Sequence, residues 1–269
     1  MKLPPMIYGT AWKEEATAGL VKLAVNAGFC GIDTANQKKH YREDFVGEAL
    51  LELKKKGIQR EALFLQSKYT YKEGQDHRLP YDPKADYPTQ VTSSFENTLK
   101  NLHTEYLDAY LLHGPRSGRG LTDADWEVWT AMEELHRSRQ ARMIGVSNVS
   151  LHHVTELCGK AKIKPQIVQN RCFAAHGWDR DVREYCVEHE IVYEGFSLLT
   201  ANPHVFNDPH VAAIARRLKA TPQQVIFRFA AQIGILPLTG TTDPQHMKED
   251  LEAMTIQLSA GDTHVILLI

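Results

Sequence analysis

The sequence predicts a single-domain α/β protein, a parallel (β/α)8 TIM barrel formed by residues 1–269. Short apolar runs of strand length alternate with amphipathic runs of helical length, eight times in succession. No two predicted strands are joined by a hairpin turn, so we expect parallel strands connected by helical crossovers. Eight consecutive units favour a closed barrel over an open sheet, and no linker or repeat divides the chain.

The individual elements follow from apolar spacing and from residues that begin helices. Pro88 stands where a helix starts, and Thr122 is a cap followed by first-turn acids. Ser150 caps the next helix. The predicted strands are 6–8, 29–32, 63–67, 107–112, 142–146, 165–168, 191–194 and 235–237. The predicted helices are 14–27, 42–56, 88–102, 122–138, 150–160, 180–189, 209–218, 222–232 and 244–254.

Composition excludes several classes of protein. The net charge of −2 gives no basis for a nucleic-acid partner. There is no apolar run long enough to cross a membrane or to act as a signal peptide, so we expect a soluble, cytoplasmic protein. The cysteines form no Cys-x-x-Cys pair, so we expect reduced thiols and neither a disulfide framework nor a bound metal; they are Cys30, Cys158, Cys172 and Cys186.

The predicted strands end in polar residues. In a barrel of this type the carboxyl ends of the strands surround one site. A single acid, lysine or histidine at such a position more often caps a helix, faces solvent or makes a polar contact. Several titratable groups on one rim favour catalysis instead. The residues at or just beyond the strand ends are Thr10, Asp33, Lys68, His113, Ser147, Asn148, Gln169, Phe196, Ser197 and Thr239.

Four stretches of the chain resemble the aldo-keto reductase superfamily. In residues 33–47 an Asp-Thr-Ala is followed by Tyr41, an acid and a Val-Gly helix start. Residues 64–68, 111–115 and 144–148 resemble the strand ends that carry the family's catalytic Lys, its catalytic His and its Gly-Val-Ser-Asn signature. These matches follow the family's order from Tyr8 to about Leu251. The loop 36–40 is longer than usual, because Tyr41 comes eight residues after Asp33 where the family usually has five.

The resemblance implies a reductase of aldehyde or ketone carbonyls that uses a nicotinamide coenzyme. Reducing a carbonyl by hydride requires a proton donor for the developing alkoxide, which we assign to Tyr41. A tyrosine suits this role if its pKa falls below about 10, and the Lys68 ammonium would lower it. Asp33 would pair with Lys68, and His113 would orient the carbonyl. His40 is the alternative to Tyr41, since no other tyrosine lies between Asp33 and the next helix.

The resemblance also implies where the coenzyme binds. No Gly-x-Gly-x-x-Gly follows any predicted strand, so a Rossmann site is not supported, and the family binds its coenzyme on the barrel rim without that motif. Ser147, Asn148 and Gln169 would hold the carboxamide, and Phe196 would stack on the nicotinamide ring. Ser197 and Leu199 would lie along the pyrophosphate. The remaining predicted coenzyme residues are Thr10, Thr239, Thr241, His246, Glu249 and Asp250.

The adenosine end departs from the family pattern. Leu238 replaces a lysine that often contacts the 2′-phosphate, His246 stands where an arginine is usual, and Asp250 where an asparagine is usual. Loss of two cations weakens the case for a 2′-phosphate. The family habit still favours NADPH, with NADH as the alternative.

The substrate is expected to be a small carbonyl compound. We expect Trp12, Tyr69 and the loop 114–122 to line the mouth, and the long loop 69–87 to cover it. The chain ends about 15 residues after the last predicted helix, so the family's long C-terminal substrate loop is expected to be absent. The expected state is a monomer or a weak oligomer.

Two other functions fit the same residues. One is a nucleotide-binding regulatory protein with little turnover, like the channel β-subunits that resemble this family. The other is Schiff-base chemistry at Lys68, because strand-end lysines in barrels can act as aldolase nucleophiles. Pairing of Lys68 with Asp33 would oppose the second function.

Overall fold

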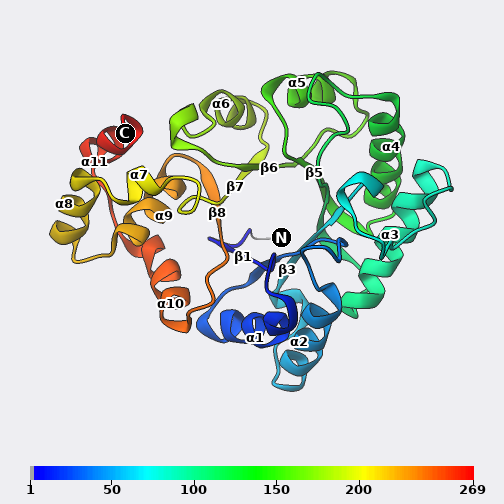
Figure 1. The fold of residues 1–269 in the computed structure, drawn as a ribbon, viewed down its shortest axis with the longest axis horizontal. Helices are drawn as coiled ribbons and strands as arrows, with labels where there is room; N and C mark the ends of the chain where they lie inside the picture. The colour runs from blue at the N-terminus through cyan, green and yellow to red at the C-terminus, as the bar shows by residue number, and fades with distance from the viewer. Residues whose placement is uncertain (1–2) are drawn as a thin grey trace.

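The computed structural model describes residues 3–269, in which eight parallel strands form a closed barrel surrounded by helices (Figure 1). Each strand pairs with the next one in the sequence, and the last pairs with the first, which confirms the predicted (β/α)8 barrel. The strands are β1 (Ile7–Gly9), β2 (Gly31–Asp33), β3 (Phe64–Tyr69), β4 (Leu107–Leu112), β5 (Ala141–Ser147), β6 (Ile167–Arg171), β7 (Val192–Phe196) and β8 (Ile235–Thr239).

The helices form the outer layer of the barrel. Thr122 and Ser150 accept hydrogen bonds from the backbone N–H groups of Asp125 and His153, which confirms both predicted caps. The α-helices are α1 (Thr17–Ala27), α2 (Glu43–Lys55), α3 (Tyr87–Leu102), α4 (Asp123–Arg137), α5 (Leu151–Lys160), α6 (Arg180–Glu188), α7 (Pro203–Phe206), α8 (Pro209–Leu218), α9 (Pro222–Gln232), α10 (Pro244–Glu252) and α11 (Ala260–Leu267).

The barrel interior has an apolar lower part and a polar upper part. An apolar cluster fills the lower part, and it consists of Ile7, Phe64, Ala109, Leu111, Ile167 and Leu238. Close to this cluster, Gly145 lets β5 approach β6: an added Cβ would lie 2.4 Å from the backbone oxygen of Ile167. The larger apolar core lies between the strands and the helices. The polar groups above the cluster therefore rest on a dry, packed base.

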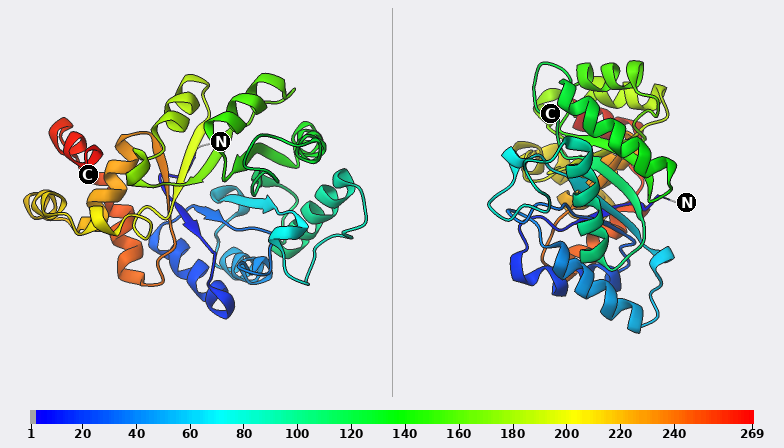
Figure 2. Two further views of the ribbon diagram at one scale, coloured as in Figure 1. Left: turned by 45° about the horizontal axis from the view of Figure 1, so that its top comes forward. Right: turned by 90° about the vertical axis from the view of Figure 1, so that its right-hand side faces the viewer.

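Two helices were not predicted. α7 spans only four residues, too few for a periodic pattern. α11 lies beyond the last predicted helix, outside the barrel against α8 and α9 (Figure 2). Its apolar residues cluster at its carboxyl end instead of forming a stripe, which is why spacing did not reveal it.

Several strands run further than predicted. β3 continues to Tyr69, β6 to Arg171 and β8 to Thr239. Apart from Leu238, the extra residues are polar or aromatic, and they pair with neighbouring strands at the rim, where apolar content no longer marks a strand. No helix within residues 3–269 is long and apolar enough to span a membrane.

The contact between α2 and α3 depends on Gly47. A Cβ at this position would lie 1.8 Å from the backbone oxygen of Asn101 in α3, so the helices would have to separate. We expect Gly47→Ala to lower the free energy of unfolding by about 2–3 kcal/mol in urea titrations. Gly19→Ala in α1 is the matched control, because no atom lies within 4 Å of its added Cβ. That variant should be as stable as the parent or up to about 1 kcal/mol more stable; equal effects of the two changes would contradict this account.

Candidate active site

A cleft of about 660 Å³ opens at the carboxyl ends of the strands. Residues from most strand ends meet in it, as the sequence predicts. The predicted site residues that line it are Asp33, Tyr41, His113, Ser147, Asn148, Gln169, Phe196, Ser197, Leu199, Thr239, Thr241, His246, Glu249 and Asp250.

Two predicted residues lie beneath the cleft instead of lining it. Lys68 is buried behind Asp33. Thr10 is fully buried, and its hydroxyl donates to the backbone oxygen of Asp33 at 2.9 Å. Thr10 therefore supports the end of β2 from beneath the cleft and is not among the residues that line it.

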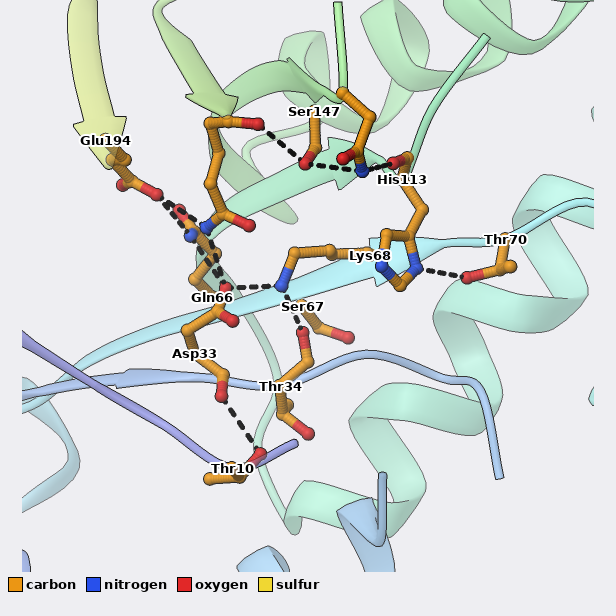
Figure 3. Close-up of polar contacts among 12 residues, drawn as sticks. Thr10, Asp33, Thr34, Gln66, Ser67, Lys68, Thr70, His113, Ser147 and Glu194 are labelled. Atoms are coloured by element: carbon orange, nitrogen blue, oxygen red, sulfur yellow. Dashed lines mark hydrogen bonds and ion pairs between the residues drawn. The ribbon is translucent and has the colours of Figure 1, made fainter. Parts of the chain in front are cut away.

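Asp33 and Lys68 form a buried ion pair, as expected (Figure 3). Lys68 Nζ lies 2.5 Å from Asp33 Oδ1 and also donates to the backbone oxygen of Thr34 at 3.0 Å. Burial acts to lower the pKa of Lys68, but the Asp33 carboxylate outweighs it and the pKa is raised. Lys68 is therefore a charged ammonium at neutral pH. A protonated amine is not a nucleophile, so this pair argues against Schiff-base chemistry.

Two amide side chains connect this pair to a second buried acid, Glu194 of β7. Gln66 and Gln169 each donate through Nε2 to both Asp33 and Glu194. Sequence reasoning missed Gln66 and Glu194. The available signal was strand alternation, because Gln66 lies two residues before Lys68, and Glu194 two residues before Phe196, on the same faces of their strands.

Tyr41 lies against the ion pair and the predicted catalytic histidine. Its ring centroid is 5.5 Å from Lys68 Nζ and 5.9 Å from the centroid of the His113 ring. Burial raises the pKa of Tyr41, and Lys68 lowers it without overcoming that effect. The expectation of a lowered pKa is therefore wrong. The phenol stays protonated at neutral pH, which is the state required of a proton donor.

His113 is a neutral imidazole at neutral pH. Its Nδ1 lies 2.7 Å from the hydroxyl of Thr70 (Figure 3). Burial, together with the charges of Lys68 and His40, lowers the pKa of His113 to about 3. A neutral imidazole has one N–H donor, and the hydrogen bond with Thr70 holds the ring in place.

His40, the alternative to Tyr41, lies at the outer edge of the cleft. Its ring packs against the Trp12 ring at a tilt of 35° with a centroid separation of 3.8 Å, and its backbone oxygen accepts from the backbone N–H of Trp12 at 2.7 Å. The longer loop 36–40 is tied down by Asn36, which donates to Thr98 in α3 and to the backbone oxygen of Ser94. The loop therefore holds Tyr41 toward the ion pair and His40 toward Trp12.

Hydrogen bonds to the backbone hold the polar side chains of the proposed carboxamide subsite in place. Ser147 Oγ donates to the backbone oxygen of Gln169 at 2.7 Å, and Asn148 Nδ2 donates to the backbone oxygen of His113 at 2.7 Å. The Phe196 ring lines the cleft, with the Arg171 guanidinium 5.7 Å from its centroid. These contacts fix polar groups and an aromatic surface around the same part of the cleft.

The other end of the cleft contains acids and one unexpected cation. Thr239 donates to Asp250 at 2.7 Å, and burial raises the pKa of Asp250 to about 6. Lys13 donates to the backbone oxygen of Gly240, just beyond β8. Residue 238 of β8 is a leucine, so the ammonium near this strand end comes from the loop after β1.

The mouth differs from the expectation. Trp12 lines the cleft and is 69% exposed, as predicted. Tyr69 is fully buried on the helix side of the barrel and contacts Tyr71 and Tyr81 of the following loop. That loop is anchored to the core by these aromatic contacts, and neither it nor the loop 114–122 contributes to the cleft lining. The prediction failed because an aromatic residue at a strand end can face either side of the barrel wall.

Among residues 3–269, no cluster of His, Cys, Asp or Glu side chains is arranged to hold a metal ion. The carboxyl end of the barrel therefore brings an acid, a phenol and an imidazole together in one cleft, with an ammonium buried beneath them.

Comparison with known proteins identifies the family. The model of the aldo/keto reductase family matches residues 5–202. The chain is 32% identical to the glyoxal reductase of Bacillus subtilis over 92% of this chain and 81% of that protein. Among solved structures, the aldo/keto reductase from Brucella melitensis has a TM-score of 0.83 and 25% identity, covering 99% of this chain and 95% of that one. The aldose reductase of Schistosoma japonicum has a TM-score of 0.85 at 24% identity, covering 100% of this chain and 89% of that one.

The chain therefore belongs to the aldo/keto reductase family and is an oxidoreductase. This family acts on carbonyl compounds and generally uses nicotinamide coenzymes.

A third buried acid, Glu43, supports the site from the start of α2. Its carboxylate accepts hydrogen bonds from Ser67, Thr98 and Asn101. Burial raises the pKa of Glu43 to about 7. Ser67 precedes Lys68, so Glu43 links α2, and with it Tyr41, to the strand that carries the ammonium.

The raised pKa of Glu43 predicts a change of stability with pH. A proton binds Glu43 more tightly in the folded than in the unfolded state, so its contribution is fully present below about pH 4.5 and is lost as the pH rises through about 7. Glu43→Gln removes this titration. From pH 5 to 8, the free energy of unfolding of the wild type should fall relative to that of Glu43→Gln, by on the order of 2–3 kcal/mol. Denaturant unfolding at each pH measures the difference, and a constant difference across this range would contradict the assignment.

Proposed function

We propose that the protein reduces the carbonyl of a small aldehyde or ketone to an alcohol with hydride from NADPH, and that Tyr41 donates the proton. The observation that carries this proposal is the placement of the Tyr41 ring, 5.5 Å from the Lys68 ammonium and 5.9 Å from the His113 ring, in a cleft lined by coenzyme-type residues. Each group belongs to a different segment, so their convergence favours catalysis over independent structural roles.

The residues of the cleft fit a nicotinamide coenzyme. Phe196 offers an aromatic face, and Ser147, Asn148 and Gln169 offer polar groups beside it. Aromatic rings prefer offset or edge contacts with other rings, which suits a flat heterocycle. When bound, the reduced coenzyme would supply the hydride. The same polar groups would hold its carboxamide, while Ser197 and Leu199 would lie along the pyrophosphate.

The four proposed catalytic residues have separate roles in proton transfer and in orienting the carbonyl. The protonated Tyr41 donates to the carbonyl oxygen as negative charge develops there. The neutral His113 aligns that oxygen by a hydrogen bond from its N–H group. The Lys68 ammonium stabilises the phenolate that remains, and Asp33 holds the ammonium in position.

Replacing Tyr41 tests the proton donor. Tyr41→Phe keeps the ring but removes the hydroxyl, so the rate of carbonyl reduction should fall by about a thousandfold while coenzyme binding is retained. The assay follows coenzyme oxidation with a panel of aldehydes and ketones, including glyoxal because a relative carries that name. His40→Gln is the matched variant of the neighbouring residue and should retain activity within about tenfold.

The reverse result, with His40→Gln inactive and Tyr41→Phe active, would assign the proton donor to His40. A wild-type protein that binds coenzyme but turns over no carbonyl in the panel would favour the alternative function, a nucleotide-binding regulatory protein.

The choice of NADPH rests on Lys13. Its ammonium donates to the backbone oxygen of Gly240 just beyond β8, and both Lys13 and Thr241 line this cleft. Charge-assisted contacts would favour a 2′-phosphate there. NADH is the alternative, because Glu249 and Asp250 also line this end of the cleft.

We expect kcat/KM with NADPH to exceed that with NADH by about tenfold or more, a difference of about 1.4 kcal/mol. Lys13→Ala should reduce the NADPH value and leave the NADH value nearly unchanged, since only the former coenzyme carries the extra phosphate. Steady-state kinetics with both coenzymes gives the comparison. A strong preference for NADH in the wild type would reverse the assignment.

A further inference from the structure

Glu194 is a buried carboxyl group to which the proposed reaction assigns no task. It projects from β7 into the barrel, pointing toward Gln66 (Figure 3), and it is fully buried. A carboxyl group placed so deeply is costly unless hydrogen bonds compensate for the lost water. Its partners therefore indicate its purpose.

Two amides bridge Glu194 to Asp33. Gln66 Nε2 lies 2.7 Å from Glu194 Oε2 and 2.9 Å from Asp33 Oδ1. Gln169 Nε2 lies 2.8 Å from Glu194 Oε2 and 3.1 Å from Asp33 Oδ1. The register of the barrel produces this arrangement, because Gln169 is paired with Glu194 and Asp33 with Gln66 on adjacent strands.

The carboxylates determine which way each amide faces. An ionised carboxylate only accepts hydrogen bonds, so both amides must turn their NH2 groups toward the acids. A reversed Gln169 amide would place its oxygen against two carboxylate oxygens. Its carbonyl oxygen is therefore directed away from the acids, toward the cleft that Gln169 lines. By contrast, the side-chain oxygen of Gln66 is buried without a partner.

Without Glu194, Asp33 would hold the Gln169 amide only weakly. Its Oδ1 already accepts from Lys68 at 2.5 Å and from Gln66, and its contact with Gln169 is the longest of the four amide contacts. Glu194 supplies the shorter bond to Gln169. The second acid is thus the stronger constraint on the amide.

We propose that Glu194 is a positioning residue that locks the Gln169 amide with its oxygen toward the cleft, as an acceptor for the carboxamide N–H of a bound nicotinamide. The ligand named here rests on the proposed function, whereas the locked amide does not.

The protonation of Glu194 gives an independent readout. The charged groups that face it are Asp33 from β2 and Lys68 from β3, and burial raises the pKa of Glu194 to about 7. Hydrogen bonds to an ionised carboxylate are stronger than those to a neutral one. The Gln169 amide should therefore be held most firmly above pH 7.

Two variants separate the acceptor from the charge. Glu194→Gln keeps an acceptor oxygen and cannot titrate, whereas Glu194→Met removes both at similar volume. Quenching of tryptophan fluorescence at pH 8 measures the Kd of NADPH and NADH, and thermal unfolding confirms that each variant is folded. We expect Glu194→Met to raise Kd about tenfold and Glu194→Gln to stay within about threefold of the wild type. A folded Glu194→Met that binds as the wild type does, or a Glu194→Gln that is equally weakened, would overturn the proposal.

A measurement on the wild type needs neither coenzyme nor a folded Met variant. With ¹⁵N-glutamine labelling, the Gln169 side-chain NH2 signal is identified by its loss in Gln169→Leu. It should exchange slowly with water and shift with a midpoint near pH 7, and the shift should be absent in Glu194→Gln. A fast-exchanging signal without pH dependence would refute the locked amide. A locked amide in a protein that binds neither coenzyme would instead refute only the proposed function and the ligand.

Discussion

The structure depends on a buried ion pair, and buried charges are stable only when they are paired and hydrogen-bonded. Lys68 and Asp33 lie 2.5 Å apart in the interior, where an unpaired charge would be strongly destabilising. The Thr34 carbonyl accepts a further hydrogen bond from Lys68, and the amides of Gln66 and Gln169 donate to Asp33. The neighbouring groups respond to this arrangement: burial, together with the ammonium, lowers the pKa of His113, and the ammonium opposes the effect of burial on the pKa of Tyr41.

The apolar part of the barrel interior strengthens the electrostatic effect of the ion pair on its neighbours. An apolar cluster fills the lower interior, and the polar network lies directly above it. Electrostatic interactions are stronger in such a dry setting than at the surface. Glu194 and Glu43 are part of the same setting, and burial raises the pKa of both to about 7. Lys68 pairs with Asp33, so Glu194 is a further buried carboxyl group without an ammonium partner of its own. It is bonded instead to the amides of Gln66 and Gln169, and this is the basis of the positioning role proposed for it.

The longer loop 36–40 adapts the rim without disturbing this interior. Asn36 ties the loop to α3, and Glu43 ties the start of α2 to Ser67 of β3 and to α3. Tyr41 lies between these two anchors in the sequence, so the extra residues are accommodated at the outer edge, where the His40 ring packs against Trp12. Substitutions in this loop would therefore alter the mouth of the cleft more than the position of the Tyr41 phenol.

The sequence alone determined the barrel, the order of its elements and most of the cleft residues, because alternating apolar periods and strand-end positions are local properties of the chain. It could not determine that Thr10 faces inward, that Tyr69 lies on the helix side, or that Lys13 reaches the end of β8. Nor could it show the bridge from Glu194 to Asp33, whose partners are 161 positions apart in numbering and meet only when the strands close into register. The sign of the pKa change at Tyr41 was likewise decided by tertiary structure, because burial is a property of the folded chain and it outweighed the ammonium beside the ring.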